Sequence, residues 1–154
     1  MNQSRITITI PLPIYLYKYV EKKFGKVYEA KDNDWFGLLV IRTLSRKSEI
    51  EYACKPEKRN MKYRITISGS KAEKYGYYFN PRNVCHIINA IDDSFRDTLF
   101  NLAIFNYENF GIDYKASFVN FLDSYNILED DINLEALLRD FRRKKHKITN
   151  NINK

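Results

Sequence analysis

The chain has few of the residues that build disulfide frameworks and metal sites. Its 154 residues include two cysteines, Cys54 and Cys85, and two histidines, His86 and His146. Two cysteines this far apart do not form a disulfide framework, and with these histidines they do not complete a zinc site. We therefore expect reduced, buried thiols in an intracellular protein that holds neither a metal nor a cofactor.

Long apolar runs are absent as well. No segment approaches the roughly 20 apolar residues that cross a bilayer. Residues 1–5 lead directly into an alternating segment and lack the apolar core of a signal peptide. We expect a cytoplasmic protein without a membrane partner, located in a host cytoplasm or a virion if a phage encodes it.

Catalytic signatures are also missing. The segment Gly69-Ser70-Lys71 lacks the first glycine and the spacing of a phosphate-binding loop. The adjacent carboxylates Asp92-Asp93 and Asp130-Asp131 stand where helix N-termini favour acidic residues. The neighbours Cys85-His86 would point in different directions from a helix or a strand. We therefore expect that the protein is not an enzyme.

The charge, by contrast, is distributed very unevenly. Residues 1–91 carry 17 Lys/Arg and 8 Asp/Glu, a net of +9, whereas residues 92–138 carry 2 and 10, a net of −8. Residues 139–154 carry 7 and 1, a net of +6. Basic blocks of this kind favour an anionic partner, usually nucleic acid, while the acidic block faces another partner or shields one.

The hydrophobic pattern predicts an α+β protein. Alternation of apolar residues predicts strands, and a helical period predicts helices. The predicted strands are 5–10, 49–54, 62–68 and 75–79, and the predicted helices are 14–24, 34–47, 92–110, 114–125 and 133–147. We expect a small antiparallel β-sheet with two helices in residues 1–80 and a mainly helical C-terminal half in residues 81–148, packed on it or continuous with it as one domain. Residues 149–154 are expected to form a flexible tail.

The strongest candidate site is the basic end of the last helix. Six cations follow its apolar stripe within nine residues: Arg139, Arg142, Arg143, Lys144, Lys145 and Lys147. Cations at a helix C-terminus also complement the macrodipole, but one or two would suffice for that. We expect the cluster to bind phosphates, with a second patch at the far end of the helix 34–47, formed by Arg42, Arg46 and Lys47.

Two helical arrangements suggest how the protein could contact DNA. The helices 114–125 and 133–147 look like a helix-turn-helix, although the connection of about seven residues exceeds the usual 3–4. The segment Arg5-Ile6-Thr7-Ile8-Thr9-Ile10-Pro11-Leu12-Pro13, followed by two helices, resembles the ribbon-helix-helix family of DNA-binding proteins over residues 5–47. That resemblance implies base reading by Arg5, Thr7 and Thr9 on a strand shared with a second subunit. We favour an ordinary half-buried strand instead, because residues 62–68 offer a partner within the chain.

Aromatic residues interleaved with basic ones form a further candidate. They are Tyr63, Arg64, Lys71, Lys74, Tyr75, Tyr77, Tyr78 and Arg82. Aromatic faces stack on any unpaired base, so this set could bind single strands. We favour the other interpretation, in which most of these rings fill the core of an aromatic-rich protein.

We expect a nucleic-acid-binding protein whose partner is double-stranded DNA. In composition and layout the chain resembles small DNA-binding proteins of phages and mobile elements, which implies a regulator or accessory factor. The alternative is a protein-interaction or assembly protein, virion-associated or an inhibitor of a host factor, which uses its acidic helical surface. In that case two copies could pair acidic and basic parts in a homo-oligomer. A third alternative is that the charges neutralise one another within a monomer.

Overall fold

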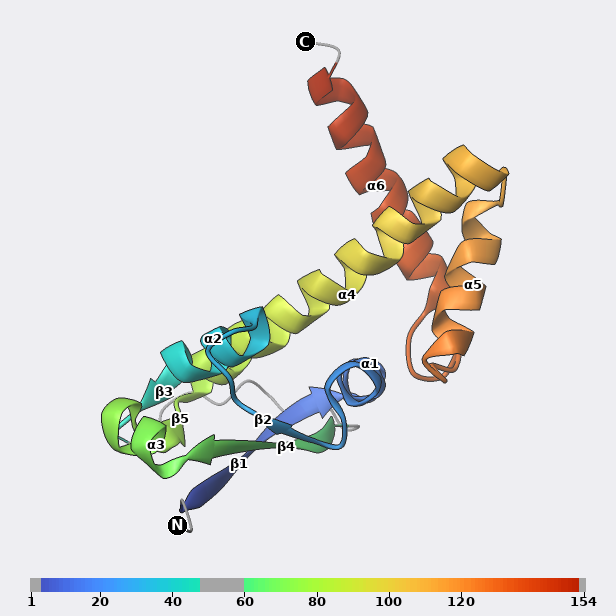
Figure 1. The fold of residues 1–154 in the computed structure, drawn as a ribbon. Helices are drawn as coiled ribbons and strands as arrows, with labels where there is room; N and C mark the ends of the chain where they lie inside the picture. The colour runs from blue at the N-terminus through green and yellow to red at the C-terminus, as the bar shows by residue number, and fades with distance from the viewer. Residues whose placement is uncertain (1–3, 48–59, 153–154) are drawn as a thin grey trace. The chain divides into compact units, whose positions relative to one another are not determined.

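The computed structural model describes residues 4–47 and 60–152. It divides into two compact units, Met1–Ser94 and Phe95–Lys154, which meet within one long helix. The elements, in chain order, are β1 (Arg5–Pro13), α1 (Ile14–Phe24), β2 (Val27–Glu29), α2 (Trp35–Thr43), β3 (Leu44–Ser45), β4 (Asn60–Ser68), α3 (Gly69–Tyr75), β5 (Tyr78–Phe79), α4 (Pro81–Phe110), α5 (Tyr114–Ser124) and α6 (Leu134–Ile152) (Figure 1). The α+β class is therefore confirmed, with helices dominating the C-terminal half.

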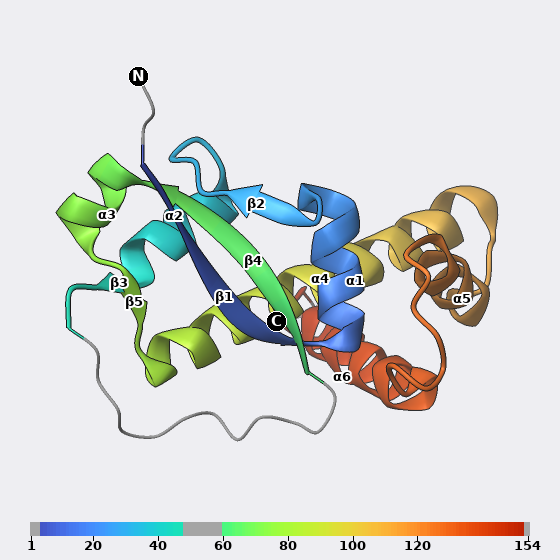
Figure 2. The ribbon, with the colours of Figure 1, turned by 90° about the horizontal axis from the view of Figure 1, so that it is seen from below.

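The first unit is built on a three-stranded sheet in the order β1-β4-β2 (Figure 2). β1 and β4 pair antiparallel along their whole length, with Ile8 opposite Ile65. β2 adds to the other edge of β4 in parallel, with Tyr28 opposite Ile65. The predicted antiparallel pairing therefore applies to β1 and β4, while the short β2 makes the sheet mixed. A separate two-stranded ladder joins β3 and β5.

One face of this sheet supplies the core of the first unit. Because side chains alternate along a strand, Ile10 and Leu12 of β1 are buried on the same side as Tyr63, Ile65 and Ile67 of β4. The buried helical side chains of this unit include Leu16, Tyr19, Val20, Phe36, Val40, Ile87 and Ile91. The core of this unit therefore includes the aromatic side chains of Tyr19, Phe36 and Tyr63.

Local signals set several helix boundaries. α1 begins directly after Pro13, as predicted, and its C-cap is Gly25 at φ +89°. α2 begins after Asp34, whose side chain accepts a hydrogen bond from the backbone N–H of Gly37 at 2.7 Å. α2 ends at Thr43, so Arg46 and Lys47 lie beyond the helix that was expected to carry them.

The second unit consists of the C-terminal part of α4 with α5 and α6. α4 has 30 residues and begins at Pro81, the start of the segment 81–148 that was expected to be mainly helical, although a helix was specified only from Asp92; it ends before Gly111 at φ +66°. Phe95, Leu99 and Phe118 are fully buried, and Phe141 of α6 packs 5.3 Å from Phe100, ring centre to ring centre. α6 is capped by Asn133, whose side-chain oxygen accepts from the N–H of Ala136 at 2.8 Å. This helix continues to Ile152 and so includes most of the predicted tail.

Other predictions concern the cysteines and the membrane. Cys85 is half-buried and disulfide-bonded, so the expectation of a reduced, buried thiol is wrong at this position. Cys54 and the predicted strand 49–54 lie outside the described residues. No helix in the described ranges is both long and apolar enough to cross a membrane.

Candidate nucleic-acid interface

The basic end of α6 follows directly from the helix's apolar stripe. Leu137, Leu138 and Phe141 are at most 3% exposed and face the core of the second unit. With 3.6 residues per turn, positions 144 and 145 return to the side of the helix that carries these residues. Positions 139 and 143 point away from that side, and position 142 lies on its flank, one turn after Leu138. The six cations of the predicted cluster therefore belong to two different faces.

Lys144 and Lys145 lie on the core side and are held by their own unit. Lys144 forms an ion pair with Asp97 of α4, and its Nζ lies 5.6 Å from the centre of the Phe100 ring. The Nζ of Lys145 donates a hydrogen bond to the Tyr114 hydroxyl at 2.5 Å and lies 4.4 Å from the centre of that ring. These contacts attach α6 to α4 and α5, although the Lys144 side chain is still 48% exposed.

Three exposed arginines lie outside the apolar stripe and are called here the arginine face: Arg139, Arg142 and Arg143. They stand at i, i+3 and i+4, so they share one exposed side of the helix. Arg143 lies 4.0 Å from the Asp140 carboxylate, but Asp140 already accepts a 2.9 Å hydrogen bond from Arg96 of α4. The Arg143 side chain remains 70% exposed.

Lys147 extends the arginine face by one turn beyond Arg143. Among the described residues, the side chains of Arg139, Arg142 and Lys147 form no ion pair or hydrogen bond. Exposed guanidinium groups match the oxygen geometry of a phosphate, to which arginine binds with two parallel hydrogen bonds. Four of the six predicted cations are therefore available to an anion.

The three residues of the predicted second patch also differ from one another in their contacts. Arg46 donates to the backbone oxygens of Glu73 and Lys74, at 3.2 and 2.9 Å, and so caps the C-terminal end of α3. Lys47 is exposed beside it. Arg42 is exposed on α2 and lines an open pocket between α2 and α3. The structure thus brings both arginines to α3: Arg42 lines a pocket with it, and Arg46 caps its C-terminal end.

This α2–α3 pocket was missed as a site by sequence reasoning. Its lining residues are Asp32, Leu38, Ile41, Arg42, Ser70, Lys71, Lys74 and Tyr75. Lys71, Lys74 and Tyr75 had been noted as members of the aromatic and basic set, and Arg42 as part of the second patch. Of that set Tyr63 is fully buried, whereas Tyr75, Tyr77 and Tyr78 are 38, 45 and 46% exposed, so the expectation that most of these rings fill the core is wrong. Pairing of α2 with α3 is a tertiary contact, so spacing along the chain gave no signal for it.

The strand that resembles a ribbon-helix-helix has its polar residues exposed. Arg5, Thr7 and Thr9 face away from the core, and Arg5 lies 3.6 Å from the carboxylate of Glu29. β1 pairs with β4 of the same chain. This is the intrachain partner that the sequence offered, and the side chains have the placement of an ordinary half-buried strand.

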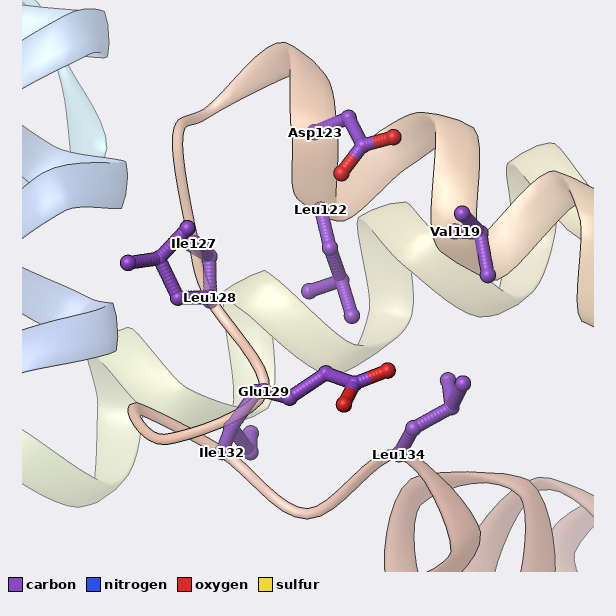
Figure 3. A pocket seen from close by; sticks show the side chains of 8 residues that line it. All are labelled: Val119, Leu122, Asp123, Ile127, Leu128, Glu129, Ile132 and Leu134. Carbon is purple, nitrogen blue, oxygen red and sulfur yellow. The ribbon is translucent and has the colours of Figure 1, made fainter.

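The acidic part of the second unit contains an apolar pocket, called here the α5–α6 pocket. It has a volume of about 150 Å³ and is lined by Val119, Leu122, Asp123, Ile127, Leu128, Glu129, Ile132 and Leu134. Figure 3 shows the aliphatic side chains with the carboxylates of Asp123 and Glu129 beside them. Leu128 is 62% exposed. The connection that forms this pocket also separates α5 from α6 by more residues than a helix-turn-helix has.

Comparisons with known proteins add no relative. No family model matches the chain, and neither a curated protein nor a solved structure matches it. Within the described residues, no group of three or more His, Cys, Asp or Glu side chains could hold a metal ion. The chemistry of the described surfaces is therefore the basis for assigning a function.

Proposed function

We propose that the protein binds nucleic acid, and specifically duplex DNA, through the arginine face of α6. The observation that carries this proposal is the separation of the six cations into two sets. Lys144 and Lys145 attach the helix to its unit, whereas the arginines and Lys147 are exposed and do not contact α4 or α5 through an ion pair or hydrogen bond within the described residues. A helix with one basic exposed face can lie along the phosphates of a groove.

The negative charge of the residues that precede the arginine face in the second unit favours a separate anionic partner for this face. The residues of the second unit before Arg139 belong to the block with a net charge of −8. If the basic residues served only to neutralise this block, their side chains would pair with its carboxylates, as Lys144 pairs with Asp97. The arginine face does not do so, apart from the 4.0 Å approach of Arg143 to Asp140. The positive potential of the arginine face is therefore available to an anionic group of another molecule.

Reversal of two charges on this face tests the proposal. Fluorescence anisotropy would compare the wild type with Arg142→Glu/Arg143→Glu on a labelled random duplex. Each lost charge-assisted contact is worth about 1.5–3 kcal/mol, so affinity should fall at least a hundredfold. The double variant Lys26→Glu/Lys62→Glu makes the same change in net charge at exposed residues of the first unit. Equal loss in both variants would contradict a localised site.

In its biological role we propose a regulator or accessory factor of a phage or mobile element. This part rests on the resemblance in composition and layout to small DNA-binding proteins of such elements. Recovery of DNA fragments bound to the protein in cells would test it, and enrichment of a defined set of sites is the expected result.

A second candidate function is supported by the α5–α6 pocket. Its apolar lining and the carboxylates of Asp123 and Glu129 fit an apolar side chain flanked by Lys or Arg in a partner protein. A second copy of the chain could supply such a segment. Sedimentation at low and high salt in the absence of nucleic acid would test this, because charge-driven self-association weakens as salt rises. A monomer at both salt concentrations would exclude the self-paired form.

A further inference from the structure

The α2–α3 pocket is an open hollow on the first unit and lies outside the proposed duplex-binding face. Its volume is about 450 Å³, within the range of small-ligand sites. α2 contributes Leu38, Ile41 and Arg42, and α3 contributes Ser70, Lys71, Lys74 and Tyr75. Both ribbon views show α3 beside β3 and β5 in this part of the unit (Figures 1 and 2).

The pocket carries an excess of positive charge. Three cations line it, Arg42, Lys71 and Lys74, against the single carboxylate of Asp32. Lys71 neutralises that carboxylate with a 2.7 Å ion pair and so lowers the pKa of Asp32. The side chain of Arg42 forms no ion pair or hydrogen bond with the described residues. An anion entering the pocket therefore meets Arg42 and Lys74 without displacing an existing ion pair.

The pocket also presents a ring and an apolar surface. Tyr75 is 38% exposed, and its ring centre lies 5.1 Å from the Nζ of Lys74. Leu38 is likewise 38% exposed, and Ile41 lies beside it in the lining. Tyr77 and Tyr78, two and three residues beyond Tyr75, have rings that are more exposed still. A cationic edge next to an aromatic and aliphatic surface matches a ligand that has both a phosphate and a flat ring.

The frame of the pocket is fixed by contacts around α3. Lys71 donates to the backbone oxygen of Ala30 at 3.1 Å, and Arg46 caps the other end of α3. Gly76, at φ +111°, approaches β3 so closely that a Cβ there would lie 2.1 Å from the Ser45 carbonyl oxygen. These contacts fix the backbone of α3, which carries Lys74 and Tyr75, without a ligand, and this reduces the entropy lost on binding.

We infer that the α2–α3 pocket binds one nucleotide of a single-stranded nucleic acid, with its phosphate between Arg42 and Lys74 and its base against Tyr75. A base inside a duplex has both faces covered by its neighbours, so stacking on Tyr75 requires an unpaired base. The exposed rings of Tyr77 and Tyr78 continue the stacking surface for adjacent bases. The inference shares its ligand class with the proposed function, but it concerns a separate surface and a separate form of nucleic acid.

Anisotropy with labelled dodecathymidine tests the inference on the full chain. Removal of a stacking ring costs about fivefold or more in affinity, so Tyr75→Leu should weaken binding by at least that factor and Tyr75→Phe by less than twofold. Arg42→Gln/Lys74→Gln should weaken it at least tenfold. Duplex affinity should stay within twofold of the wild type in all three variants. Unchanged single-strand affinity in Tyr75→Leu and in Arg42→Gln/Lys74→Gln would overturn the inference.

Amide chemical-shift mapping of the wild type with tetrathymidine does not depend on any variant. Shifts concentrated at residues 38–42 and 70–78 support the pocket, and shifts confined to α6 overturn it. The same titration with thymidine monophosphate distinguishes binding of a strand from binding of a free nucleotide. Saturation at micromolar concentrations of the monophosphate would show that the ligand is a free nucleotide and not a strand. The Arg142→Glu/Arg143→Glu variant should keep the shifts at the pocket. If it also keeps full duplex affinity, the proposed function fails while the pocket inference stands.

Discussion

Lys145 donates a hydrogen bond to the hydroxyl of Tyr114, with 2.5 Å between Nζ and the oxygen, while its ammonium also lies 4.4 Å from the centre of the same ring. A lysine in the middle of a basic run therefore serves to attach α6 to α5. A cation held over an aromatic ring and hydrogen-bonded to it has little freedom left to follow a phosphate. The basic end of α6 therefore carries two sets of cations, one that attaches the helix to its own unit and one that makes no such contact within the described part of the chain.

Two adjacent pairs of cations should therefore behave differently when neutralised. Lys144→Gln/Lys145→Gln and Arg142→Gln/Arg143→Gln remove the same charge from neighbouring positions of one helix. The lysine variant should lower the free energy of unfolding by about 1–2 kcal/mol, because it removes an ion pair and a hydrogen bond, and should leave most of the duplex affinity. The arginine variant should lose duplex affinity at nearly unchanged stability. Urea unfolding and anisotropy on both variants give the comparison.

A similar loss of duplex affinity in the two variants would contradict this division. It would mean that net charge alone attracts the DNA. Tyr114→Phe serves as a control for stability, because it keeps the ring and removes the hydroxyl that Lys145 contacts.

Asp34 should contribute more to stability than an exposed N-cap usually does. Its carboxylate accepts from the N–H of Gly37 at 2.7 Å and from the Tyr28 hydroxyl at 2.6 and 2.7 Å. Asp34→Ala removes the acceptor of both hydrogen bonds and should lower the free energy of unfolding by about 2–3 kcal/mol. Asp34→Asn keeps a capping oxygen and should cost less. Denaturant unfolding measures both, and an Asp34→Ala variant as stable as the wild type would refute this role.

Alkaline pH should destabilise the first unit through two tyrosines. Burial raises the pKa of Tyr63, and burial together with the hydrogen bond to Asp34 raises the pKa of Tyr28. In the unfolded chain both ionise near pH 10. Below that pH the hydroxyls are protonated in both states and the stabilisation is complete. Above it the unfolded state loses protons first, so each group lowers stability by about 1.4 kcal/mol per pH unit until the folded pKa is reached.

Unfolding free energies measured in steps from pH 8 to about 11 test this expectation. The slope should be smaller in Tyr28→Phe and in Tyr63→Phe than in the wild type, because each variant removes one titrating group. At neutral pH Tyr63→Phe should already be less stable, since the Tyr63 hydroxyl donates to the Gly25 carbonyl at 2.8 Å. Identical slopes in wild type and variants would show that other groups control the alkaline loss.

The parts of the fold that could be predicted from the sequence depend on local interactions. The N-caps at Asp34 and Asn133 and the helix end at Gly111 are each determined within one turn of the chain. The strand β2 and the helix α3 were not predicted. β2 is three residues long and forms only because β4 lies beside it, and α3 begins with Gly69, which disfavours a helix.

The candidate site could be predicted in position but not in detail. A helical projection of α6 contains the signal that Lys144 and Lys145 continue the stripe of Leu137, Leu138 and Phe141. The ion pair with Asp97 and the contact with Tyr114 depend on where α4 and α5 lie, and sequence spacing does not give that. For the same reason Arg46 could not be recognised as the cap of α3, 27 residues further along the chain.

The most direct test is the salt dependence of duplex binding, measured by anisotropy from about 50 to 200 mM salt for the wild type and Arg142→Gln/Arg143→Gln. Each phosphate contact contributes about 0.9 to the slope of log affinity against log salt. The arginine face with Lys147 predicts a wild-type slope near −3.6, and loss of two contacts should reduce its magnitude by about 1.8. A wild-type affinity that does not depend on salt, or an equal slope in the variant, would contradict nucleic-acid binding by the arginine face.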